Sequence, residues 1–228
     1  MDIAANLRAV EESVAAAAIA AGRTPQAITL LAVSKTRAAE DVALAVRAGA
    51  TDLGENYVQE LTDKHQALAD LDVNWHFIGH LQRNKVRAIV PFCALIHVVD
   101  SVRLADEIEA RAAAIGRLQP VLLQVDLAGE ETKYGCPEVQ VPELAAHLAG
   151  LAHAQWQGLM TIPPLGDAAE ASRPYYHRLR QWRDRLAEDF PAQDLRHLSM
   201  GMSNDYAVAI KEGATIVRIG TAVFGPRA

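Results

Sequence analysis

The sequence has 228 residues, of which 50% are hydrophobic and 22% charged, and its formal net charge is −6. A chain of this length can bury a core of its own and suffices for one α/β barrel. The negative charge disfavours a general nucleic-acid binder, because the phosphate backbone requires a basic surface. The sequence has no apolar run of membrane-spanning length and no secretory signal at its acidic N-terminal segment. We therefore expect a cytoplasmic protein that acts on small molecules and binds neither nucleic acid nor membrane.

The predicted elements alternate between helix and strand along the whole chain. A first helix is predicted over residues 2–21, with Gly22 at its end. Eight apolar runs are predicted as strands, at residues 28–35, 51–56, 74–81, 95–101, 120–128, 156–162, 196–202 and 215–225. Segments between them are predicted as helices, at residues 38–48, 57–69, 83–90, 102–115, 141–149, 168–188 and 204–212.

This alternation favours an α/β protein with a parallel sheet, and eight strand–helix units are the number that closes a (β/α)8 TIM barrel. An open doubly wound sheet is the alternative. The chain ends three residues after the eighth predicted strand, so we expect the N-terminal helix to cover the place of an eighth outer helix. Because no linker rich in Pro, Gly or Ser divides the chain, we expect residues 1–228 to form a single domain.

Lys35 follows the first predicted strand, in the stretch LLAVSKTR. Active sites of such barrels lie where the strands end. Only five of the 22 basic residues are lysines, and Lys64, Lys85 and Lys211 fall in predicted helices. A partly desolvated lysine amine can form a Schiff base with a carbonyl compound. The alternative is a rim lysine whose amine extends into solvent.

Small and hydroxyl-bearing residues follow the last two predicted strands. The stretch HLSMGMSND contains Ser199 and Ser203, and RIGTAVFG contains Gly220 and Thr221. Loops after strands seven and eight are the recurring phosphate site of this barrel, and glycine lets the backbone approach the oxygens closely. Tight turns are the alternative at each place, but both loops together favour a phosphate site.

A carbonyl-reactive lysine and a phosphate site at one barrel mouth match the two ends of pyridoxal 5′-phosphate (PLP). Five motifs extend over nearly the whole chain: AVSKT, GENYVQE, WHFIGHLQRNK, LSMGMSND and VRIGTAVFG. In these motifs the sequence resembles the pyridoxal phosphate homeostasis proteins, also called YggS-like or PROSC-like. The resemblance implies a barrel of the alanine-racemase N-terminal-domain type with an extra N-terminal helix. It also implies a protein that buffers or delivers PLP in vitamin B6 homeostasis.

The same resemblance implies a set of PLP-binding residues. Lys35 would carry the cofactor as an internal aldimine, and Arg218 would lie beside the pyridine nitrogen. The phosphate would be surrounded by Ser199, Ser203, Gly220 and Thr221. The rest of the pocket would be lined by Asn56, His80 and Met160. Lys133, in the loop Lys133-Tyr134-Gly135, is a candidate for a secondary contact with PLP.

Arg218 shares strand parity with Gly220, so both face the mouth if one does. A guanidinium only donates hydrogen bonds, so it pairs with an unprotonated pyridine nitrogen. The ring is then a weaker electron sink than one held protonated by a carboxylate, which fits a carrier better than an enzyme. An arginine in a salt bridge of the barrel is the alternative reading.

We therefore expect a PLP carrier that is not an enzyme, with PLP-dependent apoenzymes as its recipients. A PLP-dependent racemase is the nearest rival, but alanine racemases carry a second β domain, and we expect none here because the chain ends at Ala228. A Schiff-base aldolase, which would use Lys35 on its substrate and bind no cofactor, is the other rival. The sequence leaves the oligomeric state open, and we favour a monomer.

A metal site is not expected. His76 and His80 are four residues apart, a spacing that suits a metal on a helix but separates the side chains on a strand. No cysteine or acidic cluster completes a ligand set. The basic and aromatic segment 173–190 also contains acids, and its helical spacing predicts a solvated face.

Overall fold

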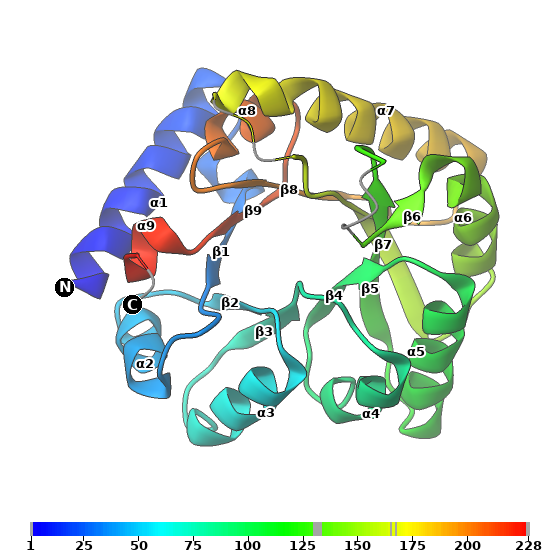
Figure 1. Ribbon diagram of the computed structural model, residues 1–228, viewed down its shortest axis with the longest axis horizontal. Helices are drawn as coiled ribbons and strands as arrows, with labels where there is room; N and C mark the ends of the chain where they lie inside the picture. Colours follow the sequence, from blue (N-terminus) through cyan, green and yellow to red (C-terminus); the bar gives the residue numbers. More distant parts are fainter. Residues whose placement is uncertain (1, 130–133, 165, 167, 227–228) are drawn as a thin grey trace.

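Eight parallel strands form a closed barrel with helices around it (Figure 1). The computed structural model describes residues 2–129, 134–164, 166 and 168–226. The strands neighbour one another in the order β4-β3-β2-β1-β9-β8-β7-β5, and a pairing between β4 and β5 closes the ring. The closed ring confirms the predicted (β/α)8 barrel over the open sheet. The barrel strands are β1 (Thr29–Val33), β2 (Asp52–Glu55), β3 (Asn74–Phe77), β4 (Leu95–Val99), β5 (Gln119–Asp126), β7 (Ala154–Met160), β8 (His197–Met202) and β9 (Ile216–Ile219).

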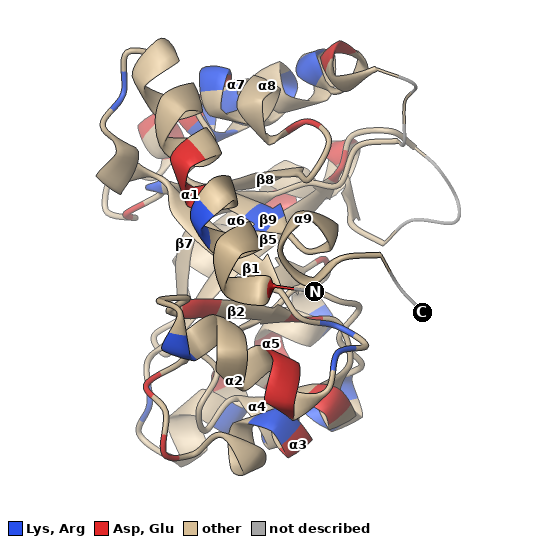
Figure 2. Cartoon of the chain, turned by 90° about the vertical axis from the view of Figure 1, so that its left-hand side faces the viewer, with Lys and Arg blue, Asp and Glu red and all other residues tan. Residues whose placement is uncertain are grey.

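These segments become strands because they are apolar on both faces. Every residue of β4 is buried, as expected for a parallel strand with the barrel interior on one side and helices on the other. Fully buried side chains such as Leu31, Leu53, Phe77 and Ile96 fill the space on these two sides. Figure 2 shows that most charged residues lie on the outer helices, while the strands between them are largely uncharged.

The helices match the predicted segments closely. They are α1 (Ile3–Ala20), α2 (Ala39–Arg47), α3 (Val58–Ala67), α4 (Val86–Ile89), α5 (Val102–Ala114), α6 (Val141–Ala149), α7 (Arg173–Asp189), α8 (Tyr206–Lys211) and α9 (Thr221–Phe224). Short 3-10 turns are η1 (Pro25–Ala27), η2 (Arg83–Lys85), η3 (Glu138–Gln140) and η4 (Ala169–Ser172). Within the part of the chain that the structure describes, none of the helices could cross a membrane on grounds of length and apolarity.

Helix α1 packs against α8, α9 and α2 (Figure 1). It thus covers the side of the barrel at which the sequence predicted no eighth outer helix. Asp2 caps it by accepting a hydrogen bond from Ala5 N at 2.9 Å. Its inner face buries Leu7 and Val14. Asn6 Nδ2 donates to Val223 O at 3.1 Å, which joins the start of the chain to α9.

Four predicted elements differ from the structure by more than two residues at one end or are divided in it. The predicted strand 74–81 ends at Phe77. The predicted strand 215–225 ends at Ile219, and the chain then turns at Gly220 into α9. The predicted helix 83–90 divides into η2 and α4, and the predicted helix 168–188 begins with η4. A two-residue strand that was not predicted, β6 (Cys136–Pro137), pairs with the end of β5. It is too short to give a periodic signal in the sequence.

Candidate ligand site at the barrel mouth

A cavity of about 620 Å³ lies at the carboxyl ends of the strands. The structure brings together around it six of the predicted residues: Lys35, Asn56, Ser203, Arg218, Gly220 and Thr221. Residues that the sequence did not single out complete the lining, among them Val33, Arg37, Ile78, Ile162, Asp205 and Phe224. We call this space the mouth cavity. It has the position at which barrels of this kind bind their ligands.

Lys35 lies in the turn between β1 and α2, and its side chain is half-buried at the mouth cavity. Ser34 N donates to Gly54 O at 3.0 Å, which extends the pairing of β1 with β2 by one residue. Thr36 then adopts a φ of 63°, a left-handed conformation that is costly for a β-branched residue. Glu60 Oε2 accepts from Thr36 N at 2.7 Å and so holds the turn.

A buried ion pair between Lys64 and Glu55 stabilises the turn that contains Lys35. Lys64 Nζ lies 2.7 Å from Glu55 Oε1 and 3.0 Å from Glu60 Oε2, and it donates to Ser34 O at 2.8 Å. Ser34 Oγ also donates to Glu55 Oε1, at 2.6 Å. Burial raises the pKa of Glu55, although the hydrogen bonds from Lys64 and Ser34 oppose the shift. The group fixes the backbone on both sides of Lys35.

We expect Lys64→Met to destabilise the protein by about 3 kcal/mol, because it leaves Glu55 buried without its cation. Urea denaturation measures the change in the free energy of unfolding. Lys211→Met, which removes an exposed lysine from α8, serves as the matched control and should stay within about 0.5 kcal/mol of the parent. An equal, small effect of both substitutions would contradict a stabilising role of the Lys64 pair.

Arg218 lies on β9 with only 5% of its surface exposed. One guanidinium nitrogen donates to Ser199 Oγ and the other to Thr161 O, each at 2.9 Å. Burial lowers the pKa of Arg218, while the negative charge of Asp205 opposes the shift. A guanidinium keeps its charge in proteins and has five N–H donors. The two bonds therefore fix the group at the mouth cavity with donors left for a ligand.

Ser203 lies in the turn after β8, Gly220 follows β9, and Thr221 is the first residue of α9; all three line the mouth cavity. A Cβ atom at Gly220 would lie 3.1 Å from Val33 O, so a glycine permits the close approach of β9 and β1 here. The two hydroxyl groups can donate to an anion in the cavity. This group of residues is the part of the lining that best fits a phosphate.

Asp205 shapes the loop that carries Ser203. Its Oδ1 accepts from Met202 N at 2.7 Å, and its Oδ2 accepts from Ser172 Oγ at 2.7 Å and Tyr176 Oη at 2.8 Å. The carboxylate is thus occupied by donors from η4, α7 and its own turn. Sequence reasoning missed Asp205. The signal that could have identified it is the Ser-Asn-Asp sequence after a strand, because an Asp in this position often closes a turn with its side chain.

Asn56 stands between the mouth cavity and a second one. Its Oδ1 is buried and has no hydrogen-bond partner among the described residues. Unpaired buried acceptors are rare, and a ligand donor is one explanation for them. A Cβ atom at Gly79 would lie 2.0 Å from Asn56 O, so only glycine allows the two segments to pack this closely. The motif GENYVQE and the motif WHFIGH meet at this contact.

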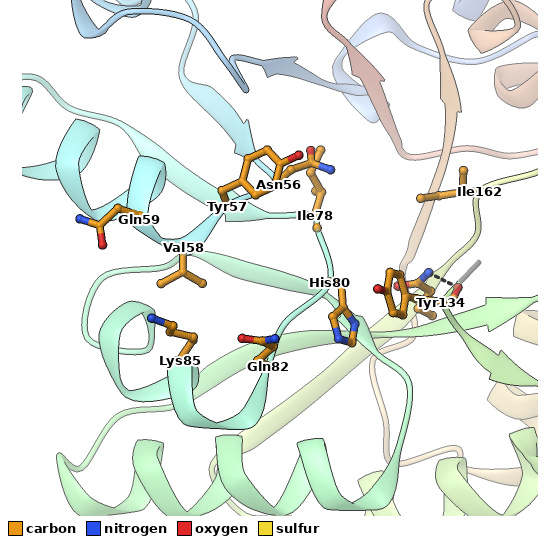
Figure 3. Close-up of a pocket in the computed structure, with 12 residues that line it drawn as sticks. Asn56, Tyr57, Val58, Gln59, Ile78, His80, Gln82, Lys85, Tyr134 and Ile162 are labelled. Carbon is orange, nitrogen blue, oxygen red and sulfur yellow. Dashed lines mark hydrogen bonds between the residues drawn. The ribbon is translucent and has the colours of Figure 1, made fainter. Parts of the chain in front are cut away.

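A second cavity, of about 630 Å³, adjoins the mouth cavity. Figure 3 shows the residues that line this second cavity. Asn56, Ile78 and Ile162 line both cavities. Of these two cavities, His80 lines the second, where its ring stacks on Tyr134 with 3.7 Å between the centroids. His80 is not among the residues that line the mouth cavity.

Met160 and Ser199 are not among the residues that line the mouth cavity. Met160, the last residue of β7, is fully buried in the core. Ser199 is also fully buried, because β8 continues for three residues beyond it. Ser203, which follows the end of β8, is the serine that lines the mouth cavity. The register between β8 and β9 shifts between Ser199 and Met202, an irregularity that the sequence pattern does not reveal. Lys133 lies outside the described residues.

Among the residues that the structure describes, no three His, Cys, Asp or Glu side chains are placed to hold a metal. His76 lies on β3, whereas His80 lies beyond the end of this strand at Phe77, so the predicted placement of both histidines on one strand was wrong. His76 is buried and contacts His97 and Asp52, whereas His80 is exposed beside Tyr134.

Comparison with known proteins identifies the fold class of this chain. The model of the alanine racemase N-terminal domain matches residues 5–228. Alanine racemase from Streptomyces lavendulae shares the fold, with a TM-score of 0.72 at 21% identity over 99% of this chain and 57% of that one. The chain is thus built on the alanine racemase N-terminal barrel.

Closer relatives define the family. The chain is 45% identical over 227 residues to the pyridoxal phosphate homeostasis protein of Aquifex aeolicus, which covers 100% of this chain and 99% of the relative. It is 41% identical over 235 residues to the protein of that name from Escherichia coli K12, covering 99% and 97%. PipY of Synechococcus elongatus PCC7942, solved with PLP bound, superposes with a TM-score of 0.85 at 36% identity, covering 98% and 100%. The chain belongs to the pyridoxal phosphate homeostasis protein family.

Proposed function

We propose that the protein binds PLP reversibly at the mouth cavity and buffers or delivers it. One observation carries the proposal: Lys35 and the hydroxyl groups of Ser203 and Thr221 line the same cavity. PLP supplies an aldehyde, which a lysine amine can bond covalently and reversibly, and a phosphate dianion. Lys35 would hold the aldehyde end, and Ser203, Gly220 and Thr221 would surround the phosphate.

The other lining residues suit the same ligand. Asn56 Oδ1 has no hydrogen-bond partner within the described part of the chain, and a polar group of the ligand would supply one. Arg218 offers donors that suit an unprotonated ring nitrogen. The bound PLP of the relative PipY and the names of the homeostasis relatives support this assignment.

We infer that the protein is a carrier and does not turn over amino acids. Arg218 supports this inference, because a ring nitrogen that accepts from a guanidinium leaves the ring a weak electron sink. Stabilising a substrate carbanion would then be difficult. Recipients of the cofactor would be PLP-dependent apoenzymes in the cytoplasm, and the carrier would act as a monomer.

We expect purified, PLP-loaded protein to racemise or transaminate alanine and serine negligibly. Chiral chromatography of the amino acids after prolonged incubation measures racemisation, and oxo-acid assays measure transamination. Activity that rose in proportion to the protein and disappeared in Lys35→Ala would overturn the carrier and favour a racemase-like enzyme.

Transfer to an apoenzyme tests delivery directly. Loaded protein is mixed with a PLP-dependent apoenzyme in the presence of a phosphatase that destroys free PLP. We expect the apoenzyme to gain activity at a rate that free PLP cannot sustain under these conditions. If the loaded protein supported no more activity than free PLP, delivery to that apoenzyme would be ruled out and buffering alone would remain.

A further inference from the structure

A continuous row of hydrogen-bonding groups crosses the barrel interior from the start of β2 to Arg218. Asp52 Oδ1 lies 3.0 Å from His76 Nε2, and His76 Nδ1 lies 2.9 Å from His97 Nε2. His97 Nδ1 lies 2.9 Å from Ser199 Oγ, which accepts from the Arg218 guanidinium at 2.9 Å. We call Asp52, His76, His97 and Ser199 the core chain. It connects the amino-terminal end of the barrel to the opposite, ligand-binding end.

The interior of this chain is closed to water. His97 and Ser199 are fully buried, and His76 is 5% exposed. Burial lowers the pKa of His97 well below its ordinary value, and the nearby charge of Arg218 lowers it further. His97 is therefore neutral, with a proton on one ring nitrogen and a lone pair on the other.

Asp52 stands at the more exposed end and is ionised. Burial on its own would raise the pKa of Asp52, but hydrogen bonds from His76 and Thr51 bring it below its ordinary value. Thr51 Oγ1 donates to Oδ2 at 2.7 Å, which leaves Oδ1 for His76. A carboxylate can only accept hydrogen bonds, so His76 Nε2 must carry a proton.

The direction of every later hydrogen bond follows from that proton. In the form of His76 that carries a single proton, on Nε2, a lone pair remains on Nδ1, so His97 Nε2 donates to it. His97 then has its lone pair on Nδ1, and the Ser199 hydroxyl must donate there. This orientation turns the lone pairs of Ser199 Oγ toward Arg218, which has donors only. The ionised end of the chain thus specifies the orientation of a hydroxyl at the other end.

We propose that Asp52, His76 and His97 are positioning residues that orient the Ser199 hydroxyl and thereby hold the Arg218 guanidinium at the mouth cavity. In the reversed direction His97 would donate to Ser199 Oγ, as Arg218 also does. The serine proton would then have no acceptor in the chain, a costly state in a buried site. Reversal therefore weakens the contact that fixes Arg218.

The tautomers of the two histidines test the direction without any ligand. Nitrogen NMR of histidine-labelled protein distinguishes protonated from unprotonated ring nitrogens and should be recorded at about pH 8, above the ordinary titration range of histidine. We expect His76 and His97 each to carry their proton on Nε2. A proton on His97 Nδ1 would overturn the proposal.

The coupling to Arg218 is tested with Asp52→Asn, which keeps the shape of the side chain but removes the charge that fixes the direction. We expect the form of His97 protonated on Nδ1 to appear. PLP should bind at least about threefold more weakly, a loss of affinity within the range typical of mutations that act on a distant site through a network of contacts. The second expectation rests on the proposed function, whereas the first does not.

Glu109→Gln is the matched control. Glu109 Oε1 lies 3.0 Å from His153 Nδ1, and the hydrogen bonds of Glu109 among the described residues go to residues 152–154, outside the core chain. This variant should leave the His97 tautomer and the PLP affinity unchanged. If Asp52→Asn behaved like Glu109→Gln in both readouts, the coupling would be overturned. If the parent protein bound no PLP at all, the proposed function would fail, and the tautomers would still decide the direction of the chain.

Discussion

Lys35→Ala is expected to abolish covalent retention of PLP. Among the described residues, Lys35 is the one lysine that lines the mouth cavity, and its amine can bond an aldehyde whose phosphate would lie near Ser203 and Thr221. The parent protein, incubated with PLP and reduced with borohydride, should gain the mass of one pyridoxyl group on the peptide that contains Lys35. The variant should gain none at that site and should lose the visible absorbance of the bound cofactor.

Lys85→Ala controls for a general loss of lysine reactivity, since Lys85 lines the second cavity. This variant should be labelled on Lys35 as the parent is. Labelling of Lys133 in the parent, with Lys35 unmodified, would show that the primary site had been assigned to the wrong residue.

The second large effect is expected from the phosphate end of the site. The double variant Ser203→Ala and Thr221→Ala removes two hydroxyl donors to a dianion, each worth about 1.5 to 3 kcal/mol as a charge-assisted hydrogen bond. PLP should therefore bind at least about tenfold more weakly, because the loss of even one bond at the lower value corresponds to about a tenfold change in the dissociation constant. Equilibrium titration followed by absorbance measures the dissociation constant.

Unphosphorylated pyridoxal separates the phosphate contact from a folding defect. It lacks the dianion, so it should bind the parent and the double variant alike. An equal loss of affinity for both ligands, or no loss for either, would place the phosphate elsewhere.

The barrel could be predicted from the sequence because its strands are buried on both faces. Runs such as Leu30 to Val33 are continuously apolar, and helices of regular spacing separate them. The exact ends of the elements could not be predicted in the same way. Gly220 turns the chain out of β9 at the mouth, although the residues after it, Thr221 to Phe224, have the composition of a strand.

The site could be predicted in part. Lys35, Ser203, Gly220 and Thr221 occur where strands end, and the rule for barrel active sites applies to them directly. Ser199 lies inside the predicted strand 196–202, which matches β8, and its burial with its contacts to His97 and Arg218 depends on packing in the assembled barrel. The core chain and the Lys64 pair were missed because each joins residues from different elements. In the sequence, Lys64 has the appearance of a solvent-facing helical lysine, and only packing buries it beside Glu55.

The visible absorption spectrum of the purified parent protein tests the central claim most directly. A Schiff base between Lys35 and PLP is yellow, whereas the lysine of an aldolase is colourless before its substrate binds. We predict a visible band, its disappearance on borohydride reduction, and about one equivalent of PLP per chain after saturation with the cofactor. A protein that stayed colourless after incubation with PLP, and yet formed a borohydride-stable adduct with a simple carbonyl substrate on Lys35, would contradict the account.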